Sequence, residues 1–408
     1  MALANAIKTV KNRTLYWEFE SNGEIPTSPQ PQPVRYEDDT GLEGTTAEMK
    51  SDIVMPDTRM PSKSELGSES NSGDINTELA VDEFDEWLSA VCCGAWVEKD
   101  RINLQVTGGA DADGTLSLTL PDGSVVTVAV VDGDTVAGVI EKILEATYAD
   151  WTVESDFISD DTIVFTYTGT GDLDTTPIFA DVSTGVTAAF DVTTRDEKEL
   201  VIGNTRKTMY LLKKYTQTPT MWKLFRGEQI NSVDLSFAVD SYVKCKWNFQ
   251  GSNNPKLVET APVTMTGAKS VLDTKSFNTR SGFLKVAGVA NRQCSSMNLS
   301  INNNMESTPA LFETEAIEQS LGDLEITGTL NEFFTDGLLY NAAKEGDSKK
   351  LEIQLTRTVD SKTTKLTIYV NAGLQAPAES GDKKYSHAIP FKVYGADGFK
   401  IIKQEITA

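Results

Sequence analysis

The chain has 408 residues, of which 39% are hydrophobic and 24% are charged, a composition typical of folded globular proteins. This length predicts two or three domains of about 150 residues each. The formal charge of −23 disfavours sequence-specific DNA binding, because so negative a field repels the phosphate backbone.

Residues that usually carry catalysis or bind metals are scarce. His387 is the single histidine, so a Ser-His-Asp or Cys-His site would depend on it, and sites with several histidine ligands are excluded. The Gly-rich turns at 108–109 and 169–171 lack the lysine of a phosphate-binding loop, and 111–114 is not followed by the closing Glu of a calcium loop. We therefore expect no enzyme activity, no metal and no cofactor.

The first 19 residues lack the apolar core of a secretory signal, and no segment has the roughly 20 apolar residues that span a bilayer. We expect synthesis in the cytoplasm and no membrane insertion. The four cysteines match neither a disulfide framework nor a metal-binding knuckle, which predicts free and mostly buried thiols.

In chain order, residues 22–33 are rich in Pro, Ser and Gln, which predicts an extended connector. Residues 37–73 form a long polar stretch with a short apolar segment at 53–55. We expect a protruding, mobile loop here, and loops this long usually need a partner to order them. A helix over 82–92 is predicted next, since Phe84, Trp87 and Leu88 fall at helical spacing and would pack on a sheet.

Residues 101–198 hold 18 Asp and Glu against four Lys and Arg, so −14 of the total charge lies in this block. Alternating apolar residues on both sides of the turn at 121–123 predict a hairpin, and Asp134-Thr135 can cap a following helix. Further strands are expected around Val153 and Phe165. The block is interpreted as a small ββαβ-type domain inserted into a host domain.

The remainder, 199–408, is dominated by period-two alternation of apolar and polar residues, strongest at 232–249 and repeated at 296–302, 351–355 and 366–370. This pattern predicts a mainly β (α+β) host, an antiparallel sandwich or barrel with one face in water. A second short helix is expected at about 335–344 and would cover one sheet face.

Several segments outside the acidic block resemble the tail tube (major tail) proteins of phages with long, non-contractile tails. The segments are Pro61–Glu65, Gly73–Leu79, Phe84–Leu88, Thr205–Met209, Phe225–Ser232, Leu299–Asn304, Ile326–Gly328 and Phe333–Gly337. The resemblance covers 1–100 and 199–408, so we expect a tail-tube domain in two parts, with 101–198 as an inserted decoration domain.

The resemblance implies a structural virion protein that assembles with itself as stacked hexameric rings. The rings would form a tube for passage of double-stranded DNA, together with tape-measure, tail-terminator and baseplate or initiator proteins. The loop at 37–73 is expected to reach the adjacent ring through Ile53, Val54, Met55, Asp57, Arg59, Lys63 and Glu65. The residues expected to line the lumen are Asp234, Ser236, Lys244 and Lys246, with packing of this face on a neighbouring protomer as the alternative.

Two other classes of protein were weighed. An acidic, β-rich adhesin that binds a receptor or carbohydrate would share the composition, with the inserted domain as its binding module. A glycosidase would need a defined pair of carboxylates near clustered aromatics, and the six tryptophans are dispersed along the chain.

Overall fold

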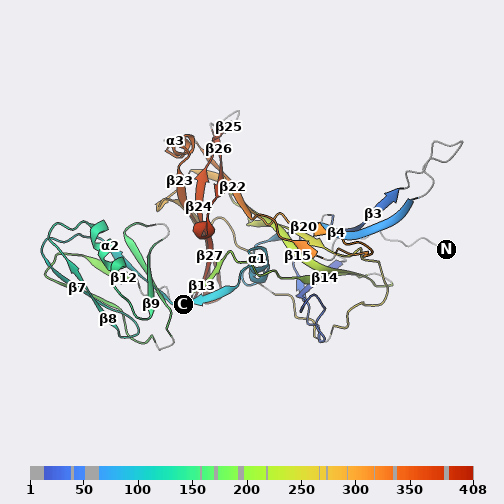
Figure 1. Cartoon of the computed structure of the whole chain (residues 1–408), viewed down its shortest axis with the longest axis horizontal. Helices are drawn as coiled ribbons and strands as arrows, with labels where there is room; N and C mark the ends of the chain where they lie inside the picture. The colour runs from blue at the N-terminus through green and yellow to red at the C-terminus, as the bar shows by residue number, and fades with distance from the viewer. Residues whose placement is uncertain are drawn as a thin grey trace.

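The computed structural model describes residues 13–37, 41–50, 64–156, 159–169, 173–191, 197–216, 219–265, 267–272, 274–291, 293–316, 318–333, 338–380 and 386–407. The molecule is elongated and mostly antiparallel β-sheet (Figure 1). A two-stranded arm projects from one end, a small β-rich module lies at the other, and the main body lies between them. The predicted β-rich sandwich class is confirmed.

The first large sheet, which we call sheet I, contains the strands with the clearest alternation. Its order is β3 (Glu43–Lys50), β4 (Ser64–Glu78), β16 (Lys244–Gly251), β15 (Met221–Ala238), β19 (Cys294–Asn302), β22 (Glu325–Phe333), β26 (Ser386–Val393) and β25 (Ala378–Ser380). In its centre Val233, Leu235 and Trp247 are fully buried, whereas Ser236 and Lys246 are exposed. The predicted half-buried hairpin at 232–249 is therefore confirmed.

Sheet II forms the opposite layer of the main body. Its order is β18 (Val289–Ala290), β17 (Gly282–Val286), β23 (Ser348–Val359), β24 (Lys362–Leu374), β27 (Phe399–Thr407), β13 (Glu197–Val201) and β5 (Trp96–Lys99). The end of β24 also pairs with β26, where Gly373 lies opposite Lys392, so the two layers join at one corner. A 3-10 turn over Ala396–Gly398 leads into β27.

A smaller sheet III shares one strand with sheet I. It consists of β2 (Gln32–Val34), β1 (Arg13–Phe19), β14 (Met209–Tyr215) and the first half of β15. β15 changes partner from β14 to β16 near Gly227, whose φ of +63° lies in the region that favours glycine. A single 18-residue strand therefore belongs to two sheets.

The main core lies between the sheets and under α1 (Asp85–Val91), close to the predicted helix at 82–92. The Trp87 ring of α1 is fully buried and lies with its centroid 5.4 Å from the Trp247 ring and 5.1 Å from the Phe249 ring, both edge-on. Such edge-to-face aromatic contacts stabilise a core beyond the area they bury. The second host helix, α3 (Leu338–Glu345), packs next to β26, where the His387 ring lies 4.7 Å from the Tyr340 ring.

The acidic block forms a module with its own hydrophobic core and two small sheets. One sheet has the order β12 (Ala188–Asp191), β6 (Arg101–Val106), β10 (Thr162–Tyr167) and β9 (Trp151–Ser155), and the other β11 (Ile178–Val182), β7 (Gly114–Thr119) and β8 (Val125–Val130). The predicted hairpin and helix are present as β7–β8 and α2 (Val136–Glu145), with Thr135 accepting a cap bond from the Gly138 N–H. The predicted ββαβ-type domain had too few strands, because the described part of the module contains seven strands in two layers.

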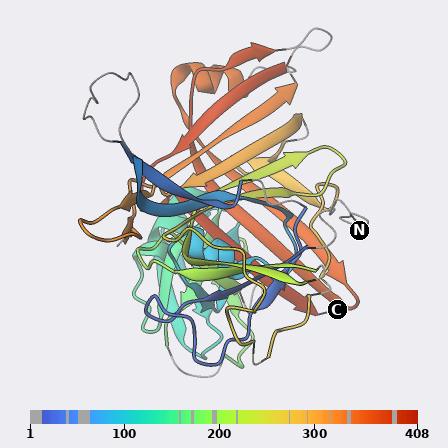
Figure 2. The same cartoon turned by 90° about the vertical axis from the view of Figure 1, so that its right-hand side faces the viewer.

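The segment expected as a protruding loop over 37–73 does protrude (Figure 1), but its described residues include two paired strands and are not a loop. β3 and β4 pair from Glu43 with Ser72 to Lys50 with Ser64 and form the projecting arm (Figures 1 and 2). The sequence pattern did not predict these strands, because much of the arm is exposed and its composition is mostly polar. Residues 38–40 and 51–63 lie outside the described residues.

A short hairpin accompanies the arm. β20 (Glu306–Thr308) pairs with β21 (Glu318–Ser320), directly after β19. Figure 2 shows this hairpin, in orange-brown, beside the base of the blue arm.

Candidate functional site

The water-facing surface of sheet I is polar across six strands, and we call it the polar face. Cross-strand pairing places its side chains in rows, because opposite residues of antiparallel strands point to the same side. The central row is Asn76, Lys246, Asp234, Ser300, Thr327 and Lys392. The flanking rows are Glu78, Lys244, Ser236, Asn298 and Thr329, and Asp74, Asn248, Ser232, Asn302 and Glu325.

Ion pairs and hydrogen bonds join neighbouring strands on the polar face. The Lys246 ammonium lies 3.0 Å from an Asp74 carboxylate oxygen, and this hydrogen bond raises the pKa of Lys246. The Ser300 hydroxyl donates to Asp234 at 2.6 Å, and Lys244 pairs with Glu78 at 3.4 Å. Opposite charges held this way neutralise one another locally.

The third lysine of the polar face is also paired. Lys392 lies 2.6 Å from the Glu325 carboxylate, which raises the pKa of the lysine. The three rows thus hold three lysines against the four carboxylates of Asp74, Glu78, Asp234 and Glu325. The face is close to neutral although the chain carries −23.

The structure brings together all four residues predicted for the lumen. Asp234 lies opposite Lys246, and Ser236 lies opposite Lys244, all on the polar face. The prediction missed the continuation of this face through β19, β22 and β26. A signal existed in the alternation of Met297 and Leu299 with polar residues, which places Asn298 and Ser300 on the same side as Ser236.

Of the seven residues predicted for contact with the next ring, Glu65 lies among the described residues. Ile53, Val54, Met55, Asp57, Arg59 and Lys63 lie outside the described residues. Glu65 is exposed near the start of β4, opposite Met49 of β3. The exposed fractions of Met49 and Leu66 are 55% and 78%, so the described end of the arm carries apolar side chains in water.

A buried carboxylate marks the point where β15 changes sheets. Glu228 is fully buried, and burial raises its pKa well above the ordinary value, with the nearby Glu20 carboxylate acting in the same direction. The pKa of Glu20 is also raised by burial, although this residue accepts a hydrogen bond from the Gly227 N–H at 3.1 Å. Glu20 lines a pocket together with Thr208 and Ser252, and the Thr208 side chain forms a hydrogen bond with the Glu20 carboxylate.

The described residues contain no group of three His, Cys, Asp or Glu arranged to hold a metal ion. Within the same ranges, no helix is long and apolar enough to cross a membrane. Two-faced sheets, an exposed arm and an appended module are features of a structural protein that acts through its contacts.

Comparison with known proteins agrees with this class. The family model described as phage tail tube protein matches residues 12–393, and the chain belongs to that family. The protein is thus a structural component of a phage virion tail. No curated protein matches the chain.

Proposed function

We propose that this protein assembles with itself as stacked rings, six subunits to a ring, and forms the tail tube of a phage with a long, non-contractile tail. Its lumen is the conduit through which the genome passes into the host. Subunits are made in the host cytoplasm and assemble there with the tape-measure, tail-terminator and baseplate or initiator proteins.

The polar face of sheet I is the observation that carries this proposal. A sheet closed into a barrel by neighbouring subunits leaves no exposed strand edges, and its polar side can line a water-filled channel. Asp234, Ser236, Lys244 and Lys246 then face the lumen. Each phosphate that is neutralised by a free Lys or Arg adds affinity for DNA. Because Lys244 and Lys246 are paired with carboxylates, such a wall allows DNA to slide with little friction.

The arm supplies the second contact of the proposal, between rings. Its strands extend past the end of β16, where Gly251 lies opposite Asn71. The segment 53–63 and Glu65 would then contact the neighbouring ring, and those contacts offset the conformational entropy that assembly costs. Deletion of 45–70 is expected to abolish tube formation, and tubes of normal length from this variant would contradict the role of the arm.

The module at 101–198 is proposed to decorate the outside of the tube. It holds most of the negative charge and has a separate core, so the main body does not depend on it for packing. An outward position also keeps its carboxylates away from the DNA path.

Electron microscopy of the purified protein at low and high concentration tests the proposal. Hollow tubes of uniform diameter are expected, with the modules visible as projections on the outside. Dispersed particles at every concentration, combined with binding to glycans, would instead favour a receptor-binding adhesin.

Cysteine labelling of assembled tubes tests the lumen assignment. Ser236→Cys is expected to react with a small maleimide but not with one attached to a large polymer. Val125→Cys, at a position 58% exposed on β8 of the module, is the matched control and should react with both reagents. Equal reaction of both variants with the large reagent would place Ser236 outside the lumen.

A further inference from the structure

Two large apolar side chains lie in water at the tip of the β20–β21 hairpin. The exposed fractions of Leu311 and Phe312 are 81% and 95%. Phe312 has a φ of +71°, a backbone conformation that is strained for a bulky residue. We call these two residues the knob. Exposed aromatics of this kind are typical anchors of protein interfaces.

The knob is held by the body of the protein and is not a free loop. The Glu69 N–H of the arm donates to the Thr314 carbonyl at 2.6 Å, and Glu69 forms a parallel bridge with Glu315. At the other side, Arg206 donates to the Gln319 carbonyl at 2.9 Å, and the buried Gln319 side chain donates to the Gly251 carbonyl. These contacts fix the direction in which the knob points and lower the entropy cost of binding.

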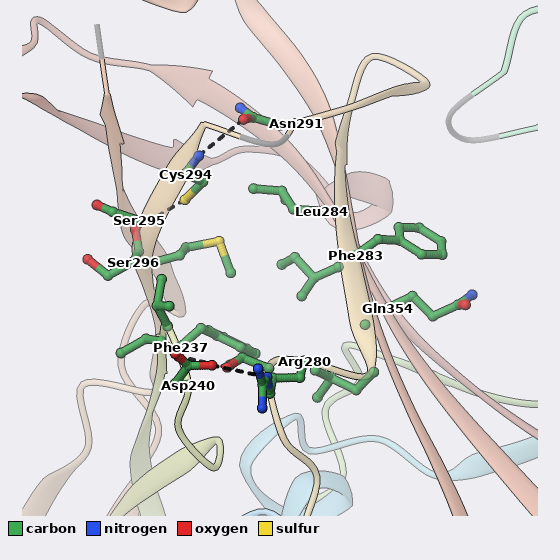
Figure 3. Close-up of a pocket in the computed structure, with 17 residues that line it drawn as sticks. Phe237, Asp240, Arg280, Phe283, Leu284, Asn291, Cys294, Ser295, Ser296 and Gln354 are labelled. Atoms are coloured by element: carbon green, nitrogen blue, oxygen red, sulfur yellow. Dashed lines mark hydrogen bonds and ion pairs between the residues drawn. The ribbon is translucent and has the colours of Figure 1, made fainter.

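A pocket of matching character lies between β19 and β17 (Figure 3). Its volume is about 270 Å³, which is small for a ligand site and suits one or two side chains. The apolar residues that line it include Phe237, Phe283, Leu284, Met297, Ile353 and Leu355. Arg280 and Asp240 pair at 3.1 Å along one side, and Cys294 lines the pocket across from Leu284.

The knob and the pocket lie at opposite ends of the same strand. Cys294 and Met297, at the start of β19, line the pocket, whereas the knob follows the end of β19 at Asn302. A subunit therefore cannot fill its own pocket, and the knob of a second copy fits the geometry.

We propose that the knob of one subunit inserts into this pocket of a subunit in the adjacent ring. The inference rests on the proposed function and adds a defined contact to it. A contact that joins two different surfaces closes into a ring when its rotation closes and otherwise propagates into an open assembly, and a contact between adjacent rings is of the second kind. The knob and pocket would thus repeat along the whole length of the tube, next to the contacts made by the arm.

Covalent capture through Cys294 tests the contact. Phe312→Cys places a thiol on the knob, and Cys294 already supplies one in the pocket, while the other three cysteines are buried. Assembled protein treated with a short bis-maleimide is expected to give a ladder of dimers, trimers and longer products on a denaturing gel. A contact between identical surfaces would instead stop at dimers, and a contact within one ring would stop at six subunits; either result would overturn the proposal.

Two matched variants control this experiment. The double variant Phe312→Cys/Cys294→Ser removes the pocket thiol and should give no ladder. Val125→Cys places a thiol on the module at a position that is 58% exposed, and should give none either. A ladder from either control, or tubes of Phe312→Cys that give no ladder, would overturn the knob contact while leaving the tail tube function intact.

Assembly without cross-linking gives a second measurement. Phe312→Asp should raise the concentration needed for tube formation at least tenfold, because a carboxylate cannot enter an apolar pocket without a partner. Phe312→Leu should assemble close to normally, since it keeps an apolar side chain. Normal assembly of Phe312→Asp would contradict the inference alone, whereas failure of the unaltered protein to assemble at any concentration would contradict the proposed function as well.

Discussion

Lys99 and Glu197 lie opposite one another on paired antiparallel strands, although 97 residues separate them in the chain. Opposite residues in such a pair have Cα atoms about 5 Å apart. The chain therefore leaves the main body at the end of β5 and returns at the start of β13, at adjacent points of sheet II.

Replacement of 100–196 by Asn-Gly should leave the main body folded, because this dipeptide closes a tight antiparallel hairpin between Lys99 and Glu197. We expect a soluble protein that retains the near-ultraviolet circular dichroism of the Trp87 and Trp247 cluster. Loss of that signal, or insolubility of the shortened chain together with stability of an isolated 101–196 fragment, would mean that the body needs the module to fold.

Arg101 fastens the module to sheet II through a buried charge cluster. Its guanidinium pairs with Glu197 at 3.5 Å and also with Glu199, and burial raises the pKa of Glu197. Arg101→Met leaves both carboxylates without their cation and should destabilise the protein by about 3 kcal/mol at pH 8. The loss should be smaller at pH 5 than at pH 8, because burial raises the pKa of Glu197 and its protonated form needs no cation.

Urea unfolding at the two pH values measures this effect, and Lys198→Met is the matched control. Lys198 pairs with Glu98 at 3.3 Å, but both side chains are at least half exposed, so its removal should cost less than about 1 kcal/mol. Equal losses for the two variants would contradict a buried cluster at Arg101.

The two hydrophobic cores predict separable unfolding. Leu118 of the module and Leu299 of sheet I are both fully buried strand residues. Each change to Ala should cost about 2–5 kcal/mol, but in different thermal transitions, since the two side chains belong to separate clusters. Differential scanning calorimetry of both variants should shift one transition each. A single transition that both substitutions shift equally would show that module and body unfold together.

Glu228 predicts a pH dependence of stability with a definite sign. Its folded pKa lies well above the ordinary 4.5, so the folded protein holds this proton more tightly than the unfolded chain. The contribution of Glu228 to the free energy of unfolding is fully present below its pKa in the unfolded chain. It is lost as pH rises through its pKa in the folded protein. Glu228→Gln cannot ionise and should keep that stability at pH 8.

Thermal melts at pH 5 and pH 8 measure this difference. The melting temperature of Glu228→Gln minus that of the unaltered protein should be at least about 2 °C larger at pH 8 than at pH 5. This change corresponds to roughly one unit of difference between the folded and unfolded pKa of Glu228. Glu98→Gln, at an exposed position, should show no such rise. A constant difference for Glu228→Gln would mean that its carboxyl ionises as freely in the fold as in the unfolded chain.

Sequence patterns predicted those parts of the fold in which one face is buried and the other is wet. Val233, Leu235 and Trp247 alternate with polar residues, so their strands and the polar face of sheet I could be predicted together. The helices at α1 and α2 followed from apolar residues at helical spacing. In each case the positions that face the core carry apolar side chains, so apolar residues recur at the period of the strand or helix.

The other features of the fold could not be predicted, because no periodic pattern in the sequence marks them. Glu65 and Leu66 lie on an arm that is wet on most sides, so no alternation marks its strands. The pairing of β15 with both β14 and β16 depends on residues far apart in the chain. The knob at Leu311-Phe312 has too few residues to form a pattern, and only its exposure in three dimensions identifies it.

The unbroken length of β15 has a mechanical consequence. A load along this strand acts in shear on its hydrogen bonds to β14, β16 and β19 at the same time. The strand therefore resists the load with many hydrogen bonds together, and they do not break one after another. We expect bending between sheet III and sheet I to be centred on Gly227, where the backbone can change conformation with least strain. In the proposed tube, a curving tail would then flex its subunits near this residue while sheet I keeps its shape.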